Sequence, residues 1–418
     1  MRRYLVLIVV CLFMASLFGC RPTGNLVIRN FANQYNEIPK TRLLQVVPFS
    51  QNDSITHIFA RWRYSDLVYR KNNTGKLLQA FFSLNFEVYP DFQSTILQDS
   101  GTFIFADSLH AGSSLMCDFE FDVKAPKGQN SLLILTLFDR NSNTPHITTF
   151  YIRKREPGSS SYFQASQKGS GLLYSSVLYT RQPVVVTCAN TTIKSLYVSL
   201  FRQIFPLPAP PFVPDERPRF NYKPDKRFLI PLENGNSAPL LELNEQGFYF
   251  FSTDSAFREG FTLFRYSPGF PEVINARQML TPLRYITSTK EFEKLKTSTN
   301  IRSAVDSFWL ATAGNSDRAL TLIHDYYSRV QRANELFSSY TEGWQTDRGL
   351  IYIVNGTPNV VYRRNLLEEW IYGEAGNIRS LHFYFAKAEN PFTTSDYVLS
   401  REPDIKQAWY MAIERWRR

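Results

Sequence analysis

EGWQTDRGLIYIVNGTPNVVYRR, residues 342–364, decides how the C-terminal part of this chain folds. Thr346 or Asp347 can cap the segment 347–354, because each offers a side-chain oxygen to the free backbone N–H groups of a first helical turn. Apolar residues give this segment one buried face, and its β-branched residues leave a strand as an open alternative. The Gly-x-Pro that begins at Gly356 ends the element in either case.

The residues on both sides of this stretch predict helices before it and strands after it. VVYR, EEWIYG and IRSLHFYF are expected to form a short antiparallel meander. Upstream, Ser288 and Glu291 form a capping-box pattern that opens a helix through Lys296. Apolar residues at helical spacing predict further helices in 301–309, in 319–337 and in the last segment, 403–418.

This motif resembles the GWxTD domain, which is found mainly in Bacteroidetes and some other Gram-negative phyla. The matching residues are Gly343, Trp344, Thr346, Asp347, Arg348, Gly349, Tyr352, Gly356 and Pro358, followed by Trp370 and Tyr372. The resemblance covers about 280–400 and implies a lipoprotein with no assigned catalytic residues. A second, local resemblance links IVNGTP, EWIY and LHFYF to BamE/SmpA, the small lipoprotein of outer-membrane protein assembly. That resemblance implies a protein-binding module.

The N-terminus has the features of a lipoprotein signal sequence. Residues 1–19 combine Arg2 and Arg3 with an apolar core, which predicts a signal peptide. The Leu-x-Gly-Cys ending resembles the bacterial lipobox and implies lipidation of Cys20, with 20–25 as a tether. An ordinary signal peptide or a single membrane anchor is the alternative. The residues after Cys20 include no acid, which by resemblance to the Bacteroidetes export rule favours the periplasmic face of the outer membrane.

Two β-sandwich (Ig-like) domains are expected between the tether and the helices, at 26–155 and 160–270. Short apolar runs separated by turn residues are typical of such domains. Gly158 to Ser161 would link them. The proline-rich segment 206–218 is read either as a partner-binding ribbon or as a stiff inter-strand loop. Two further cysteines, Cys117 and Cys188, are predicted to be free thiols. The fold class is therefore multidomain α+β, with a helical plus α+β GWxTD domain at 285–418.

Nothing in the sequence predicts an enzyme. No metal-type spacing, nucleophile motif or dinucleotide fingerprint occurs, so no metal and no cofactor are expected. Glu368 and Glu369 are adjacent, and in a strand they would face opposite sides. Asp347 and Arg348 are the best catalytic candidates, but a cap and a buried ion pair explain them as well. The net charge of +10 is mildly basic, and the export signal argues against nucleic acid as a partner.

The expected function is that of a non-enzymatic, lipid-anchored outer-membrane protein facing the periplasm. It would bind other envelope proteins as a structural or assembly component of outer-membrane protein biogenesis or of secretion or gliding machinery. The last helix is expected either to pack on the motif domain or, through Trp409, Trp416 and Arg417, to contact a partner. The open edge of VVYR or LHFYF is expected to accept a strand from a partner. The alternatives are a surface glycan-binding lipoprotein and an unrecognised hydrolase.

Overall fold

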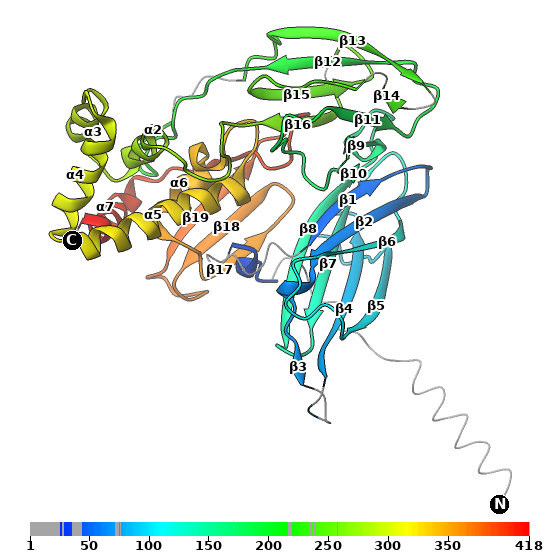
Figure 1. Ribbon diagram of the computed structural model, residues 1–418, viewed down its shortest axis with the longest axis horizontal. Coiled ribbons are helices and arrows are strands. Elements are labelled where there is room, and N and C mark those ends of the chain that lie inside the picture. Colours follow the sequence, from blue (N-terminus) through cyan, green and yellow to red (C-terminus); the bar gives the residue numbers. More distant parts are fainter. Residues whose placement is uncertain are drawn as a thin grey trace, which may run out of the picture.

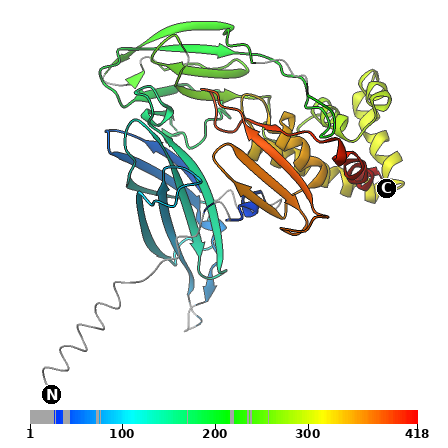
Figure 2. The same ribbon diagram turned by 180° about the vertical axis from the view of Figure 1, so that it is seen from behind.

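The computed structural model describes Leu26 and residues 29–35, 44–71, 75, 77–169, 171–215, 220–233, 236–237, 240–256 and 258–417. The predicted signal peptide 1–19, Cys20 and the tether 20–25 lie outside these residues. Figures 1 and 2 show two β-rich parts and a third, mixed part that carries the helices. The predicted order of two sandwiches, a helical segment and a small α+β domain is confirmed. Across the described part of the chain, no helix has the length and apolar character to span a membrane.

The first β-rich part is a sandwich of two antiparallel sheets. One sheet has the order β1-β2-β6, with β1 (Gln45–Phe49), β2 (Ile55–Arg63) and β6 (Met116–Lys124). The other has the order β3-β4-β7-β8, with β5 also on β4; its strands are β3 (Arg70–Lys71), β4 (Leu78–Tyr89), β5 (Asp99–Asp107), β7 (Asn130–Asp139) and β8 (Thr144–Arg153). Residues on β2 alternate between buried and more exposed, as a strand with one face on the core requires. Trp62 and Phe82 meet across the core with ring centroids 5.8 Å apart.

The second part is one continuous sheet that folds over on itself. Its order is β10-β9-β11-β14-β13-β12-β15-β16. The strands are β9 (Phe163–Gln167), β10 (Gly171–Leu172), β11 (Val184–Cys188), β12 (Ser195–Phe201), β13 (Lys226–Glu233), β14 (Asn236–Ser237), β15 (Gly247–Ser252) and β16 (Phe261–Arg265). Val186, Val198 and Phe251 belong to one buried cluster, so the two ends of the sheet enclose a common core. Cys117 and Cys188 are both free, as predicted.

The predicted linker at Gly158 to Ser161 is a packed junction. Ser159 and Ser161 are buried, and the carbonyl of Ser161 accepts a 2.7 Å hydrogen bond from the backbone N–H of Ser50. The hydroxyl of Ser161 accepts from the backbone N–H of Arg153 at 2.9 Å. Small polar residues resemble a flexible linker in sequence, but here they satisfy backbone groups between two sandwiches.

The third part packs helices on a four-stranded antiparallel sheet. The helices are α2 (Ala276–Leu280), α3 (Thr289–Lys296), α4 (Ile301–Ala313), α5 (Ser316–Phe337), α6 (Asp347–Asn355) and α7 (Lys406–Arg417). The sheet has the order β17-β18-β19-β20, with β17 (Val360–Arg363), β18 (Leu367–Tyr372), β19 (Leu381–Lys387) and β20 (Tyr397–Leu399). The predicted capping box is present, because Ser288 and Glu291 each bond the other's backbone N–H. Segment 347–354 is a helix, with Thr346 Oγ1 accepting from Gly349 N at 3.0 Å.

The first described residues of the chain belong to this third part. Leu26, Phe31 and Tyr35 are buried in the same cluster as α5, α6 and the β17–β20 sheet. Phe31 N donates to the carbonyl of Val361 on β17 at 2.9 Å, and Figure 1 shows the dark-blue turn beside β17. The predicted range 26–155 therefore begins with a segment of another domain, which we call the N-terminal strap (Leu26 and residues 29–35).

The predicted open edges of the meander are wrong at VVYR and at the end of LHFYF. The strap covers β17, the VVYR strand, through the hydrogen bond from Phe31 and through Asn30 Oδ1, which accepts from Val361 N at 3.0 Å. The end of β19, at Phe385–Lys387, pairs with a fourth strand, β20, and Leu381–Phe383 of LHFYF lie outside this pairing. β20 has only three residues, too few for a recognisable alternation, so its pairing with β19 was missed.

Of the two alternatives for the terminal helix, packing on the motif domain is correct and the partner contacts are wrong. Trp409 and Trp416 are 2% and 6% exposed and pack in the core of the third part. Trp416 Nε1 donates to the carbonyl of Val354 at 3.1 Å, and Arg417 forms an ion pair with Glu291 at 2.5 Å. The aromatic, basic face of α7 therefore binds its own chain.

The proline-rich segment is an inter-strand connection that docks on the third part. Between β12 and β13, Leu207 and Phe212 pack against the C-terminal core. Arg401 reaches the carbonyl of Ala209 at 3.3 Å and the carboxylate of Asp215 at 2.9 Å. Residues 216–218 of the predicted loop lie outside the described part. The loop interpretation is confirmed for the described residues.

Candidate functional site

The two glycines of the motif place three backbone segments in direct contact. A Cβ atom on Gly343 would lie 1.9 Å from the carbonyl oxygen of Ala333 on α5, and one on Gly349 would lie 1.9 Å from the carbonyl oxygen of Gly343. Neither position has room for a side chain. The motif therefore joins α5, the turn η7 (Gly343–Gln345) and α6 through their backbones.

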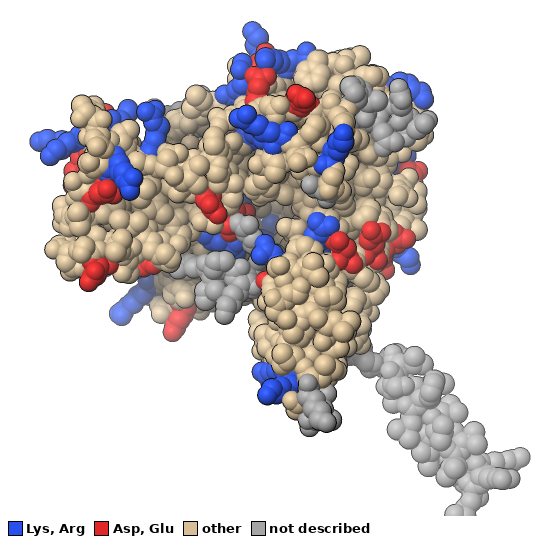
Figure 3. Space-filling view, in the orientation of Figure 1, with Lys and Arg blue, Asp and Glu red and all other residues tan. Residues whose placement is uncertain are grey.

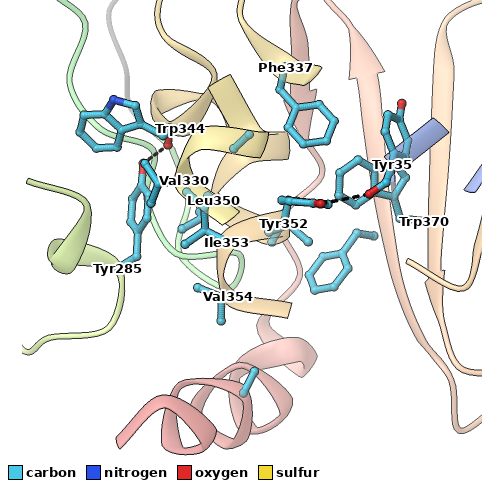
Figure 4. Packing of buried hydrophobic residues seen from close by; sticks show 14 of the residues in the cluster. Tyr35, Tyr285, Val330, Phe337, Trp344, Leu350, Tyr352, Ile353, Val354 and Trp370 are labelled. Carbon is cyan, nitrogen blue, oxygen red and sulfur yellow. Dashed lines mark hydrogen bonds between the residues drawn. The ribbon is translucent and has the colours of Figure 1, made fainter. Parts of the chain in front are cut away.

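Trp344 extends from this contact into the core. Its indole N–H donates to Glu342 at 2.9 Å, and its carbonyl accepts from the hydroxyl of Tyr285 at 2.7 Å. Figure 4 shows Trp344 and Tyr285 at one end of the cluster and Trp370 at the other. Tyr372 bonds the carbonyl of Gly356 at 2.8 Å, so the later motif residues also serve the packing of the helix on the sheet.

Asp347 and Arg348 do not pair with each other. The Asp347 carboxylate accepts from the backbone N–H of Leu399 at 2.9 Å and from Arg401 at 2.6 Å. It thereby fixes β20 against the start of α6. Arg348 lies one residue later on the helix and faces Glu368 on β18, with 3.7 Å between Nη1 and Oε2. Each residue forms a buried ion pair, as predicted, but Asp347 pairs with Arg401 and Arg348 pairs with Glu368.

Glu368 is the centre of a buried polar network, which we call the Glu368 network. Its carboxylate accepts from the hydroxyl of Tyr35 at 2.6 Å and from the indole N–H of Trp370 at 2.6 Å. Arg363 Nε donates to it at 3.0 Å, and the Arg363 guanidinium also bonds the Tyr35 hydroxyl. Tyr35 comes from the strap and Arg363 from β17. The network therefore ties the beginning of the chain to the motif sheet.

The charges of this network are set by its arginines. Burial alone would raise the pKa of Glu368, but Arg363, Arg348 and the two hydrogen bonds outweigh burial and lower it. Burial raises the pKa of Tyr35. At neutral pH the carboxylate is therefore an anion and the phenol is neutral. One carboxylate faces two guanidinium groups, so the network carries an excess positive charge.

A cavity of about 800 Å³ lies where the three parts meet. Its walls come from the strap, β8, β9, β16, the end of α5 and residues 391–397. Arg348, Arg363 and Glu368 line one wall, and Tyr151 and Arg153 of β8 line another. Figure 3 shows both basic and acidic side chains around the hollow between the parts. The volume is in the range of small-molecule sites.

Residues 247–418 match the GWxTD domain family. The chain contains a GWxTD domain. The match begins at β15, earlier than the predicted start at 285. Phe392, in the connection between β19 and β20, packs on this strand, since its ring lies 5.0 Å from that of Phe248 and 4.9 Å from that of Phe250 on β15. The last strands of the second sandwich and this connection thus share one aromatic cluster.

Comparisons with curated proteins and with solved structures add no information on the fold or activity of this chain. No curated protein matches this chain. A solved structure of red sea bream transglutaminase aligns with 54% of this chain and 31% of its own, at 11% identity and a TM-score of 0.20. The chain thus spans about a third of that protein's length, and a likeness this small carries no argument about fold or activity.

The structure brings together residues that the sequence analysis kept apart. Arg348 and Trp370 belong to the Glu368 network, whereas Trp344, Thr346 and Asp347 serve the packing of α6. Tyr35 and Arg363 were missed. As predicted, Glu368 and Glu369 face opposite sides, since Glu369 pairs with His382 at 2.9 Å. Among the described residues no group of three or more His, Cys, Asp or Glu side chains is arranged to hold a metal ion.

Proposed function

We propose that this chain is a non-enzymatic outer-membrane lipoprotein that faces the periplasm and binds other envelope proteins as a structural or assembly component. The motif residues support a structural role for the GWxTD domain, because their polar groups are bonded within the chain. The partner-binding surface then has to lie elsewhere. The observation that carries the proposal is the open side of the first sandwich.

At this open side both sheets end in a strand with one partner. Within the residues described, β5 pairs only with β4, and β6 pairs only with β2. Such edges present unpaired backbone groups and invite strand addition. β5 has nine residues, and none between Ser100 and Ala106 is charged or proline. The usual protections of an exposed edge are therefore missing from β5.

Half-exposed phenylalanines lie between the two edges. The ring of Phe119 on β6 lies 4.8 Å from Phe103 and 5.1 Å from Phe105, both on β5. A strand added here would cover these rings with its inward side chains. Its outward side chains would meet Asp118, Glu120 and Asp122, the exposed row of β6. The partner that fits is an extended segment that alternates apolar and basic residues.

Ile104→Lys should abolish partner binding and leave the fold intact. Ile104 is 68% exposed on β5, so a lysine there costs little stability, while a charge on an edge opposes strand addition. The measurement is co-purification of envelope proteins after detergent solubilisation, with a melting curve for each variant. The matched control is Ile378→Lys at a fully exposed position of the GWxTD domain. Equal recovery of partners by both variants would argue against this edge.

The membrane attachment is proposed to depend on Cys20. Leu26 is buried in the core of the third part, and six residues of chain reach at most about 20 Å. A lipid on Cys20 would therefore hold the GWxTD domain close to the membrane. Cys20→Ala is expected to move the protein from the membrane fraction to the soluble fraction. Retention of this variant on membranes after a salt wash would show another attachment.

A further inference from the structure

Exposed apolar side chains gather at the end of the first sandwich that carries β3 (Figure 1). Hydrogen bonds tie the connections at this end to one another. The Asp139 carboxylate accepts from the backbone N–H of Val68 at 2.7 Å, and the Asp107 carboxylate accepts from the Tyr69 hydroxyl at 2.7 Å. The exposed apolar residues, which we call the apolar tip, are Val68, Leu77, Leu78, Leu109 and Leu115. Leu109 is 86% exposed and Leu115 is 60% exposed, so the described part of the chain does not cover them.

Exposed cations surround the apolar tip. Arg70 and Lys71 form β3, and Arg140 directly follows β7. All three side chains are exposed, and among the described residues no carboxylate forms an ion pair with them. Figure 3 shows an uncharged surface at the lower end of the first sandwich, with basic side chains at its tip.

The carboxylates near the apolar tip are engaged within the chain. Asp107 and Asp139 accept the hydrogen bonds described above. Asp66 is half-buried beside Arg63. Asp118, where the exposed row of β6 begins, is held in an ion pair. The free charge around the apolar tip is therefore positive.

We infer that the apolar tip binds the surface of a membrane that contains anionic phospholipids. Aliphatic side chains among lysines and arginines are the composition of surfaces that enter the boundary between lipid headgroups and acyl chains. The cations attract anionic headgroups while the leucines leave water. A protein interface would instead be expected to present tryptophan or tyrosine as its anchors. This site goes beyond the proposed partner binding, since it uses the connections at the end of the sandwich and not the edge of β5.

The position of the strap agrees with a membrane at this end. Arg29 of the strap pairs with Glu87 on β4 at 3.2 Å, and the residues from Ala80 to Glu87 span about 23 Å along that strand. The chain from the proposed lipid on Cys20 to Leu26 reaches about 20 Å. One bilayer could therefore hold the lipid and touch the apolar tip at the same time.

Vesicle binding by a chain that lacks residues 1–20 tests the apolar tip without the lipid. This removal leaves every described residue in place. The protein should co-sediment with vesicles of phosphatidylethanolamine and phosphatidylglycerol, mixed about three to one, and bind phosphatidylcholine vesicles more weakly. Leu109→Asp should lower the affinity for the anionic vesicles about tenfold or more, because it removes buried apolar surface and adds a negative charge. At so exposed a position the change should leave the melting temperature unaltered.

The matched control is Leu320→Asp, which changes an exposed leucine on α5. It should bind the anionic vesicles as the wild type does. A second variant, with Arg70→Glu and Lys71→Glu together, should also lose about tenfold or more on anionic vesicles, because each cation near the surface contributes several-fold.

The inference is overturned if the wild type binds neither kind of vesicle, if it binds both equally, or if Leu109→Asp keeps the wild-type affinity. Equal losses in Leu109→Asp and Leu320→Asp would also overturn it. No partner protein is present in this experiment, so its failure is distinct from a failure of partner binding, which Ile104→Lys tests.

Discussion

Gly349→Ala is expected to destabilise the protein by more than about 3 kcal/mol, although alanine in place of glycine inside a helix usually stabilises by about 0.5–1 kcal/mol. The added Cβ would lie 1.9 Å from the carbonyl oxygen of Gly343, where ordinary contact needs roughly twice that distance. Both contacting groups are backbone, so relief requires moving α6 or the η7 turn. Overpacking typically costs about 1–3 kcal/mol and costs more where nothing can yield. Urea unfolding of the two proteins measures the difference.

The control for this substitution is Gly112→Ala. Gly112 has a φ of +75°, which side-chain-bearing residues rarely adopt, but nothing lies within 4 Å of an added Cβ. Its cost should be about 1–2 kcal/mol, which is the penalty for the left-handed conformation alone. Equal losses at both positions would mean that the close backbone contact is not what the motif glycine provides.

Glu368→Gln is expected to cost about 3–5 kcal/mol, because it leaves two buried guanidinium groups without a carboxylate. Glu368 is 1% exposed and accepts from Tyr35, Arg363 and Trp370. The glutamine retains the size of the side chain but not its charge. The strap should lose its attachment first, which protease digestion near the N-terminus would detect along with a lower melting temperature.

The matched control is Glu245→Gln at a surface ion pair. Glu245 pairs with Arg202 and Lys226, and all three side chains are well exposed. Such pairs contribute at most about 1 kcal/mol. A loss at Glu368 no larger than the loss at Glu245 would contradict the central position of the Glu368 network.

The Glu368 network also predicts the response to acid. The pKa of Glu368 is lower in the folded protein than in the unfolded chain, where it has its ordinary value. The unfolded chain therefore binds the proton first, and the stabilisation is present above the ordinary carboxyl pKa and is lost as the pH falls through the folded-state pKa. Glu368→Gln should remove this part of the acid sensitivity.

Local patterns predicted the elements of the GWxTD domain, because their signals lie within a few residues. The capping box of Ser288 and Glu291 predicted the start of α3. In α6 the cap at Thr346 outweighs the preference of the β-branched residues for a strand. The Glu368 network could not be predicted in this way. Tyr35 and Glu368 are 333 residues apart in the sequence, and the strap carries no periodic pattern that would place it on a sheet. The adjacency of Asp347 and Arg348 even suggested the wrong pair.

The wrong predictions about exposed helix faces and open strand edges have one cause. An apolar stripe such as that of Trp409 and Trp416 predicts that one helix face is covered, but not by which chain. The same holds for a strand edge, since the strap covers β17 at Val361 and β20 covers the end of β19, and neither segment has a strong pattern of its own. The open edge of β5 became visible only when all pairings of the first sandwich were known.

Site-specific photo-crosslinking in living cells tests most directly whether this chain acts by binding proteins through its first sandwich. A photoreactive amino acid at position 104 should crosslink to another envelope protein, whereas the same probe at the more exposed position 378 of the GWxTD domain should not. Both positions are exposed, so neither probe should disturb the fold. Crosslinks from position 378 without any from position 104 would contradict the account and place the partner on the GWxTD domain.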